Sequence, residues 1–364
     1  MSRGKFMPGR RRSGGWKRLA GGLVLALVGG LIWFWFRPAP SPRRKLIPPP
    51  PRTAVPTAST ARPAPAPPVV SPVVLSGATS RPVRDAFETQ IALVRRAISS
   101  GPIDGAIGSQ TRAAIAAFQR SQGLSPTGSL DPDTRLRLTL EAPVMTHYVV
   151  TTNDLARLQP LGKGWQEKAE QSALEYETGL ELIAEKSHAH PAFIRQLNPG
   201  VNWAGLAAGT VLTLPAAEYP EPEASAARVV IHLSEKYLEA FDAETHLLLH
   251  CPCSIAARVE KRPVGELHVA VLAPHPNYTI DPAVFPESPE AQAVGHKLVL
   301  PPGPNNPVGV AWIGLDKPGY GIHGTPAPEQ VGRTESHGCF RLANWDAEYL
   351  VPLVWIGLPV RVEP

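Results

Sequence analysis

Apolar residues in the last third of the chain recur with a period of two, the pattern of half-buried β-strands. Val229, Ile231 and Leu233 show this spacing. Residues 237–241, the turn at 242–245 and residues 246–250 predict a hairpin. Further strand candidates lie at 267–272, 308–315 and 360–362. We therefore expect a mainly antiparallel β domain over residues 226–364.

From residue 84 to residue 141 the apolar spacing becomes helical. Phe87, Ile91, Val94 and Ile98 recur at intervals close to 3.6 residues. The segment resembles the three-helix peptidoglycan-binding domain, which implies a small helical domain. The matching residues are Ile103, Asp104, Gly105, Gly108, Thr111, Arg112, Ala117, Phe118, Gln119, Thr127 and Gly128.

Residues 146–216 mix strand and helix patterns. A strand beginning at His147, a helix around residues 181–185, the turn Asn198-Pro199-Gly200 and an apolar run at 206–215 resemble a LysM module. The usual Gly-Asp-Thr turn is absent, and residues 152–179 form an insertion. The resemblance implies a degenerate α+β LysM-like module.

The N-terminal region predicts a membrane anchor. A basic tail precedes an uncharged apolar run at 19–36, which as a helix reaches about 27 Å and so nearly spans a bilayer core. Trp33 and Trp35 suit the membrane interface. A cleaved signal peptide is the alternative, but we favour an uncleaved anchor over residues 1–37. Because positive flanks stay in the cytoplasm, the remaining domains are expected in the periplasm or cell-wall space.

The amino-acid composition constrains the domain organisation, the expected partners and the number of disulfides. Many of the 42 prolines lie in residues 38–83, which predict an extended linker. The net charge of +5 comes with no basic patch interleaved with aromatic residues, so nucleic acid is not an expected partner. Three cysteines in 364 residues are too few for a disulfide scaffold.

One of those cysteines lies in a segment that suggests nucleophilic catalysis. Cys339 follows His337 by two positions and His323 by 16 (339 − 323). A thiol attacks a carbonyl as thiolate, so it needs a base such as imidazole. A strand, a loop and a return can bring His323 beside the thiol. Amides near Gly338 are candidate oxyanion donors, and Arg341 adds a charge that favours thiolate or binds a carboxylate.

The same segment resembles the YkuD-type, or ErfK/YbiS-like, L,D-transpeptidase family, whose signature is a His-Gly, a loop and Ser-His-Gly-Cys. The resemblance implies Cys339 as nucleophile and His323 as base, oriented by the Gly324 carbonyl, with no cofactor or metal. Asn344 is also expected to cap a short helix. The predicted support residues are Ser336, His337, Gly338 and Gly324, and the predicted substrate-binding residues are Arg341, Tyr320 and Asn344.

A second cluster competes for a chemical role. His246, His250, Cys251 and Cys253 carry the side-chain types that bind zinc. The pattern of this segment predicts the end of a strand, and no second pair of cysteines has the spacing found in zinc fingers. A disulfide between Cys251 and Cys253 would close a strained ring. We therefore expect two reduced cysteines and no metal.

The resemblance implies a multidomain enzyme that acts on peptidoglycan. A thioester at Cys339 would pass a stem peptide to an amine and form a cross-link. Two alternatives stay open: a carboxypeptidase or hydrolase that uses the same cysteine with water, and a wall-binding scaffold without catalysis. The expected partners are peptidoglycan stem peptides and glycan strands, with the inner membrane bound through the N-terminal helix.

Overall fold

The computed structural model describes residues 80–283, 286, 289–334, 336 and 338–364. The predicted tail, anchor and linker lie outside these residues, so those predictions are not tested. Within the described residues, no helix is both long and apolar enough to cross a bilayer. The described residues belong to one compact unit, Val73–Pro364.

The helices predicted between residues 84 and 141 are present. They are α2 (Ala86–Val94), α3 (Ser109–Ser121) and α4 (Pro132–Arg137), and a short ribbon of β1 (Arg81–Pro82) and β2 (Thr139–Leu140) joins their ends. Asp85 starts α2 as its N-cap, because its side chain accepts the backbone N–H of Glu88. Buried Ile91, Ile115 and Phe118 form the contact between the helices.

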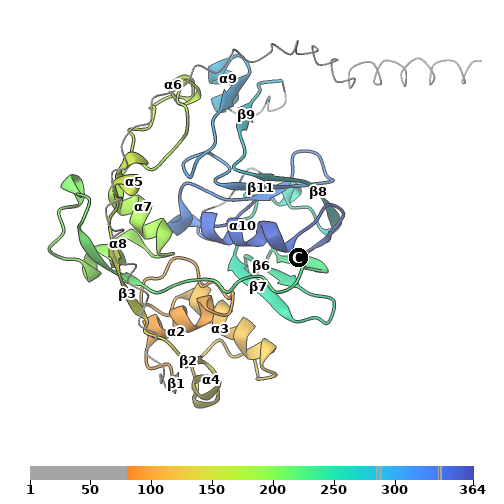
Figure 1. Cartoon of the computed structure of the whole chain (residues 1–364). Helices are drawn as coiled ribbons and strands as arrows, with labels where there is room; N and C mark the ends of the chain where they lie inside the picture. Colours follow the sequence, from red (N-terminus) through yellow and green to blue (C-terminus); the bar gives the residue numbers. More distant parts are fainter. Residues whose placement is uncertain (1–79, 284–285, 287–288, 335, 337) are drawn as a thin grey trace, which may run out of the picture. The chain divides into compact units, whose positions relative to one another are not determined.

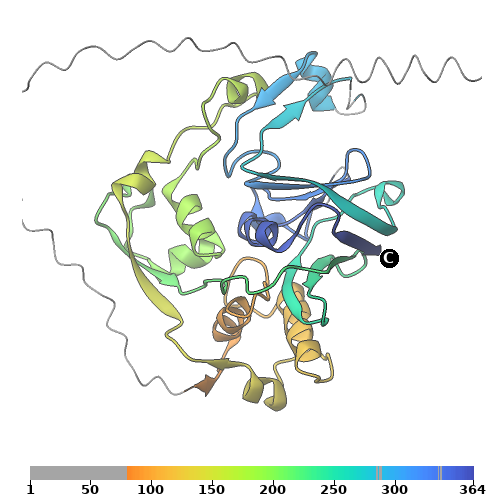
Figure 2. The ribbon, with the colours of Figure 1, turned by 45° about the vertical axis from the view of Figure 1, so that its right-hand side comes forward.

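The next segment is a β-ribbon with helices inserted between its strands. The ribbon pairs β3 (Met145–Val149) with β4 (Val211–Pro215) in antiparallel register. Helices α7 and α8 lie side by side next to it (Figures 1 and 2). The elements between the strands are α5 (Thr152–Ala156), α6 (Trp165–Ala169), α7 (Gly179–Lys186), α8 (Pro191–Leu197) and η1 (Trp203–Gly205).

The three-helix segment and this ribbon segment share one hydrophobic core. Ile98 and Phe118 of the first belong to the same buried cluster as Ile183, Ile194 and Leu212 of the second. The two segments therefore pack against each other through a continuous set of buried side chains. We call residues 80–217 the accessory region.

The C-terminal domain is built on an eight-stranded sheet. Its strand order is β13-β12-β11-β8-β14-β5-β6-β7, and only the pairs β12–β13 and β14–β5 are parallel. The predicted mainly antiparallel domain and its hairpin are therefore confirmed. The strands are β5 (Arg228–His232), β6 (Tyr237–Phe241), β7 (Leu247–Pro252), β8 (Gly265–Pro274), β11 (Ala311–Leu315), β12 (Gly321–His323), β13 (Phe340–Arg341) and β14 (Pro359–Glu363).

Helix α10 (Asn344–Leu350) lies against this sheet next to β11 (Figure 1). Its buried Ala347 and Leu350 enter a core with Ile231, Ile313 and Phe340. A smaller cluster joins the accessory region to a ribbon outside the main sheet. The remaining elements are β9 (Tyr278–Ile280), β10 (Leu298–Leu300), α9 (Pro289–Val294), η2 (Val259–Lys261), η3 (Pro328–Gln330) and η4 (Val351–Leu353).

The accessory region contacts the outer strand of the sheet through its backbone. Ile98 and His250 of β7 form a parallel bridge, in which the Ser99 N–H donates to the His250 carbonyl at 2.7 Å. Arg120 of α3 pairs with buried Glu239 of β6 at 2.5 Å. These contacts hold the helical segment at the β7 end of the sheet.

Candidate active site

Strands β12 and β13 bring the segments of the predicted nucleophile and base side by side. They run parallel, with Ile322 opposite Phe340 and His323 opposite Arg341. Cys339 directly precedes β13, so it lies across from the start of β12. Paired residues of neighbouring strands share a face, so His323 and Arg341 point the same way. Cys339 lies two residues before Arg341, and continued alternation would put its side chain on that face as well. By strand geometry the Cα atoms of His323 and Cys339 are about 8 Å apart. The Cys339 thiol donates to the Gly319 carbonyl at 3.5 Å, just before β12.

The imidazole of His323 is oriented by two neighbours. Its Nδ1 lies 2.6 Å from the carbonyl oxygen of Gly324. A carbonyl can only accept, so Nδ1 carries the proton and Nε2 keeps its lone pair. The indole of Trp312 stacks on the ring, with centroids 5.6 Å apart. Trp312 was not predicted; it is opposite His323 in the β11–β12 register, which only the strand pairing reveals.

Burial keeps both reactive groups neutral in the resting site. Desolvation lowers the pKa of His323 to about 4, and the Gly324 contact only partly opposes this. Desolvation likewise raises the pKa of Cys339 to about 11. The charge of Arg341 lowers both pKa values. For His323 this adds to the effect of burial, whereas for Cys339 burial outweighs the predicted effect of the charge. The site therefore suits proton transfer during attack rather than a preformed thiolate–imidazolium pair.

The turn before the cysteine is fixed by Ser336. Its backbone N–H donates to the Ile255 carbonyl at 2.8 Å, and its hydroxyl donates to the Cys339 carbonyl. The Gly338 N–H donates to Ser336 Oγ at 3.2 Å. The Gly338 amide therefore has a partner in the resting site, and the oxyanion role of the amides near Gly338 stays a prediction. His337 lies outside the described residues.

Asn344 differs from both of its predicted roles. The N-cap of α10 is Ala343, and Asn344 is the first helical residue. Its side chain is 1% exposed and fully engaged within the protein, so it is closed to substrate. The amide oxygen accepts the backbone N–H groups of Thr325 at 3.0 Å and Val310 at 3.3 Å. Asn344 therefore supports the chain just after His323 rather than binding substrate.

The other two predicted substrate residues lie beside the thiol. Arg341 is partly buried and follows Cys339 by two positions. The Tyr320 ring is 3.8 Å from where a side chain at Gly338 would begin, so it borders the same turn. Lys317 lies over this ring at 5.2 Å. Their contact with substrate stays a prediction.

The four residues considered as zinc ligands in the sequence lie apart in the structure. Cys251 and Cys253 are buried free thiols, and burial raises the pKa of each. His250 is buried against Glu239, whereas His246 is exposed at the hairpin turn. The four residues therefore do not share one site.

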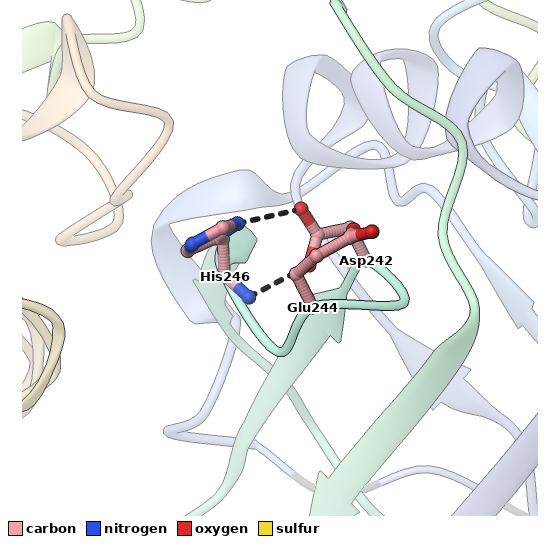
Figure 3. Close-up of side chains that lie close together, drawn as sticks. All are labelled: Asp242, Glu244 and His246. Carbon is pink, nitrogen blue, oxygen red and sulfur yellow. Dashed lines mark hydrogen bonds and ion pairs between the residues drawn. The ribbon is translucent and has the colours of Figure 1, made fainter.

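Another group of potential ligands occurs at that turn. Asp242, Glu244 and His246 have ligand atoms within 4.8 Å of one another (Figure 3). The Asp242 carboxylate accepts both the backbone N–H of His246 at 2.7 Å and its Nδ1 at 2.9 Å. These two bonds connect the ends of the turn, since aspartate side chains in turns commonly accept from nearby backbone N–H groups.

Comparison with protein families identifies two segments of the chain. Residues 226–362 match the family described as the L,D-transpeptidase catalytic domain. Residues 85–138 match the family described as a putative peptidoglycan binding domain. The first segment contains β12, β13 and the Cys339 site, and the second contains the three helices α2, α3 and α4.

Individual relatives agree with these matches. The chain is 25% identical over 185 residues to a putative L,D-transpeptidase YkuD of Bacillus licheniformis, covering 51% of this chain and 93% of that protein. It is 28% identical over 212 residues to a probable L,D-transpeptidase YbiS of Escherichia coli K12, covering 55% and 61%. A solved L,D-transpeptidase from Mycobacterium smegmatis has a TM-score of 0.31 and 16% identity, covering 45% of this chain and 80% of that chain.

The match to the L,D-transpeptidase catalytic domain covers the segment that sets Cys339 beside the strand of His323. The chain therefore carries an L,D-transpeptidase catalytic domain downstream of a putative peptidoglycan binding domain, and it is an enzyme of the L,D-transpeptidase class.

Proposed function

We propose that this protein transfers peptidoglycan stem peptides through a thioester on Cys339. The observation that carries the proposal is the parallel pairing of β12 and β13, which sets the segment of Cys339 beside the strand of His323 within the matched catalytic domain. As the thiol sulfur bonds to the donor carbonyl carbon, its proton moves to Nε2 of His323. The C–N bond then breaks, and the leaving amine takes that proton.

The second half of the reaction restores the thiol. An acceptor amine attacks the thioester carbonyl and passes a proton to His323. The C–S bond breaks, and the sulfur recovers a proton from the imidazole. With an amine acceptor the product is a new amide, which is a cross-link when the amine belongs to another stem. Water in place of the amine gives the alternative activity, a carboxypeptidase or hydrolase.

The segments outside the catalytic domain support peptidoglycan as the proposed substrate. The three-helix segment matches a putative peptidoglycan binding domain. The β3–β4 ribbon with α7 and α8 between its strands supports the proposed LysM-like module at 146–216. The apolar run at 19–36 supports an inner-membrane anchor that leaves the folded domains in the periplasm or cell-wall space. Tethering to the wall raises the local concentration of stem peptides.

The test is direct. The purified chain is incubated with muropeptides and analysed by mass spectrometry for an acyl group on the peptide that contains Cys339. We expect an adduct in the wild type and none in Cys339→Ala, and an adduct that persists without the cysteine refutes the assignment. Dimeric products indicate transfer, and trimmed monomers indicate hydrolysis. A folded wild type that never acylates supports the scaffold alternative.

A further inference from the structure

A carboxylate from the accessory region reaches the chain segment that follows His323. Glu185 lies near the end of α7, 159 residues before Asn344. The Asn344 Nδ2 donates to both carboxylate oxygens of Glu185, at 3.1 and 3.0 Å. Tyr176 holds the carboxylate in turn, because its hydroxyl donates to Glu185 Oε1 at 3.0 Å. Neither Glu185 nor Tyr176 belongs to the matched catalytic domain.

These contacts leave the Asn344 amide only one orientation. Its Nδ2 faces the acceptors Glu185 and Pro304, the latter at 3.2 Å, and its Oδ1 faces the N–H groups of Thr325 and Val310. A flipped amide would set donor against donor and acceptor against acceptor. Glu185 therefore helps to keep Oδ1 directed at the backbone of the catalytic domain.

That backbone is the one that orients the imidazole. Gly324, whose carbonyl accepts from His323 Nδ1, precedes Thr325 in the chain. A side chain at Gly324 would begin 2.2 Å from Asn344 Oδ1, so the amide packs directly on this segment. A continuous series of contacts thus runs from Glu185 through Asn344 to the residue that fixes the tautomer of His323.

We propose that Glu185 is a positioning residue for His323, supplied by the accessory region and acting through Asn344. The inference rests on the proposed function, because it concerns the rate at which the base serves Cys339. Displacing the base lowers the acylation rate but leaves substrate binding unchanged. A displacement of about 1 Å can lower the rate by up to roughly 100-fold. The accessory region then has a part in catalysis besides any contact with the wall.

Two single substitutions in the full chain separate positioning from stability. Glu185→Ala is expected to lower the first-order rate of Cys339 acylation by about 10- to 100-fold, with little change in the half-saturating donor concentration. Lys186→Ala is the matched control. Lys186 lies on the same helix as Glu185 and forms an ion pair with Asp154 of α5 at 3.0 Å. Its side-chain hydrogen bonds go to Tyr148 and Asp154, away from Asn344. Lys186→Ala should destabilise the accessory region and leave the acylation rate unchanged.

A donor–acceptor exchange tests the coupling itself. In Asn344→Asp the new carboxylate faces the carboxylate of Glu185. At pH 8 this variant should therefore acylate Cys339 more slowly, as Glu185→Ala does. Adding Glu185→Gln to Asn344→Asp restores a donor opposite an acceptor at this contact, whereas the Pro304 carbonyl still faces an acceptor. Part of the lost rate should therefore return. The double variant keeps the test available should Glu185→Ala fail to fold.

Three results would overturn the inference: Glu185→Ala at the wild-type rate, Glu185→Ala no slower than Lys186→Ala, or no recovery in the double variant. A wild type without any Cys339 adduct would instead overturn the proposed function.

Discussion

Alkylation of Cys339 as a function of pH tests whether the resting thiol is neutral. With a pKa of about 11, the thiolate fraction at pH 7 is about 10⁻⁴. An ordinary cysteine with a pKa near 8.5 has about 3% thiolate there, so Cys339 should react roughly 300-fold more slowly. The thiol pKa lies about four units above pH 7, so ionising Cys339 at pH 7 costs about 5 kcal/mol of free energy.

The assay is iodoacetamide labelling without substrate, from pH 5 to pH 10, quantified on the peptide that contains Cys339. The log of the rate should rise by one for each pH unit with no plateau below pH 10. The same peptide from urea-unfolded protein gives the reference reactivity, and peptide mapping separates the signal from Cys251 and Cys253. A plateau with a midpoint below about pH 8 would refute the reasoning, because it would show a preformed thiolate–imidazolium pair.

Three further predictions concern stability, each measured by urea unfolding. Arg120→Ala should destabilise the protein by about 1–3 kcal/mol, because buried Glu239 loses a charged partner, whereas exposed Arg112→Ala should change little. Phe118→Ala should cost about 3–5 kcal/mol, since the ring is 1% exposed; a loss under 1 kcal/mol would contradict this packing. Burial raises the pKa of Asp346 to about 7, so its stabilising contribution is complete below about pH 4 and is lost as the pH rises through 7. The wild type should lose roughly 2–4 kcal/mol over that range, and Asp346→Asn should remove this slope.

The strands with clear alternation could be predicted from the sequence. The hairpin of β6 and β7 has apolar residues on one face and a polar turn, and a local pattern determines its pairing. The spacing of apolar residues likewise predicted a helix from Phe87, and the resemblance to a peptidoglycan-binding domain implied the three-helix arrangement. By contrast, β12 has three residues and β13 has two, too few to show any period.

The sequence could propose the reactive residues of the site, but it could not predict their geometry. The His323 and Cys339 motif is local, but the parallel pairing that sets Cys339 beside the strand of His323 is a tertiary contact. Asn344 has a side chain suited to an N-cap, and it instead satisfies the N–H groups of two distant segments. Glu185 contacts Asn344 across 159 residues, and nothing in its local sequence indicates that partner.

The bridge between Ile98 and His250 affects how the catalytic domain behaves when isolated. Within the whole chain, the backbone of residues 97–99 occupies hydrogen-bonding groups of β7, the last strand of the sheet. A protein truncated at residue 226 would leave those groups open to a second molecule, and exposed strand edges promote intermolecular pairing. Self-association or low solubility of such a fragment would therefore reflect a missing intramolecular neighbour rather than a defect in the catalytic fold.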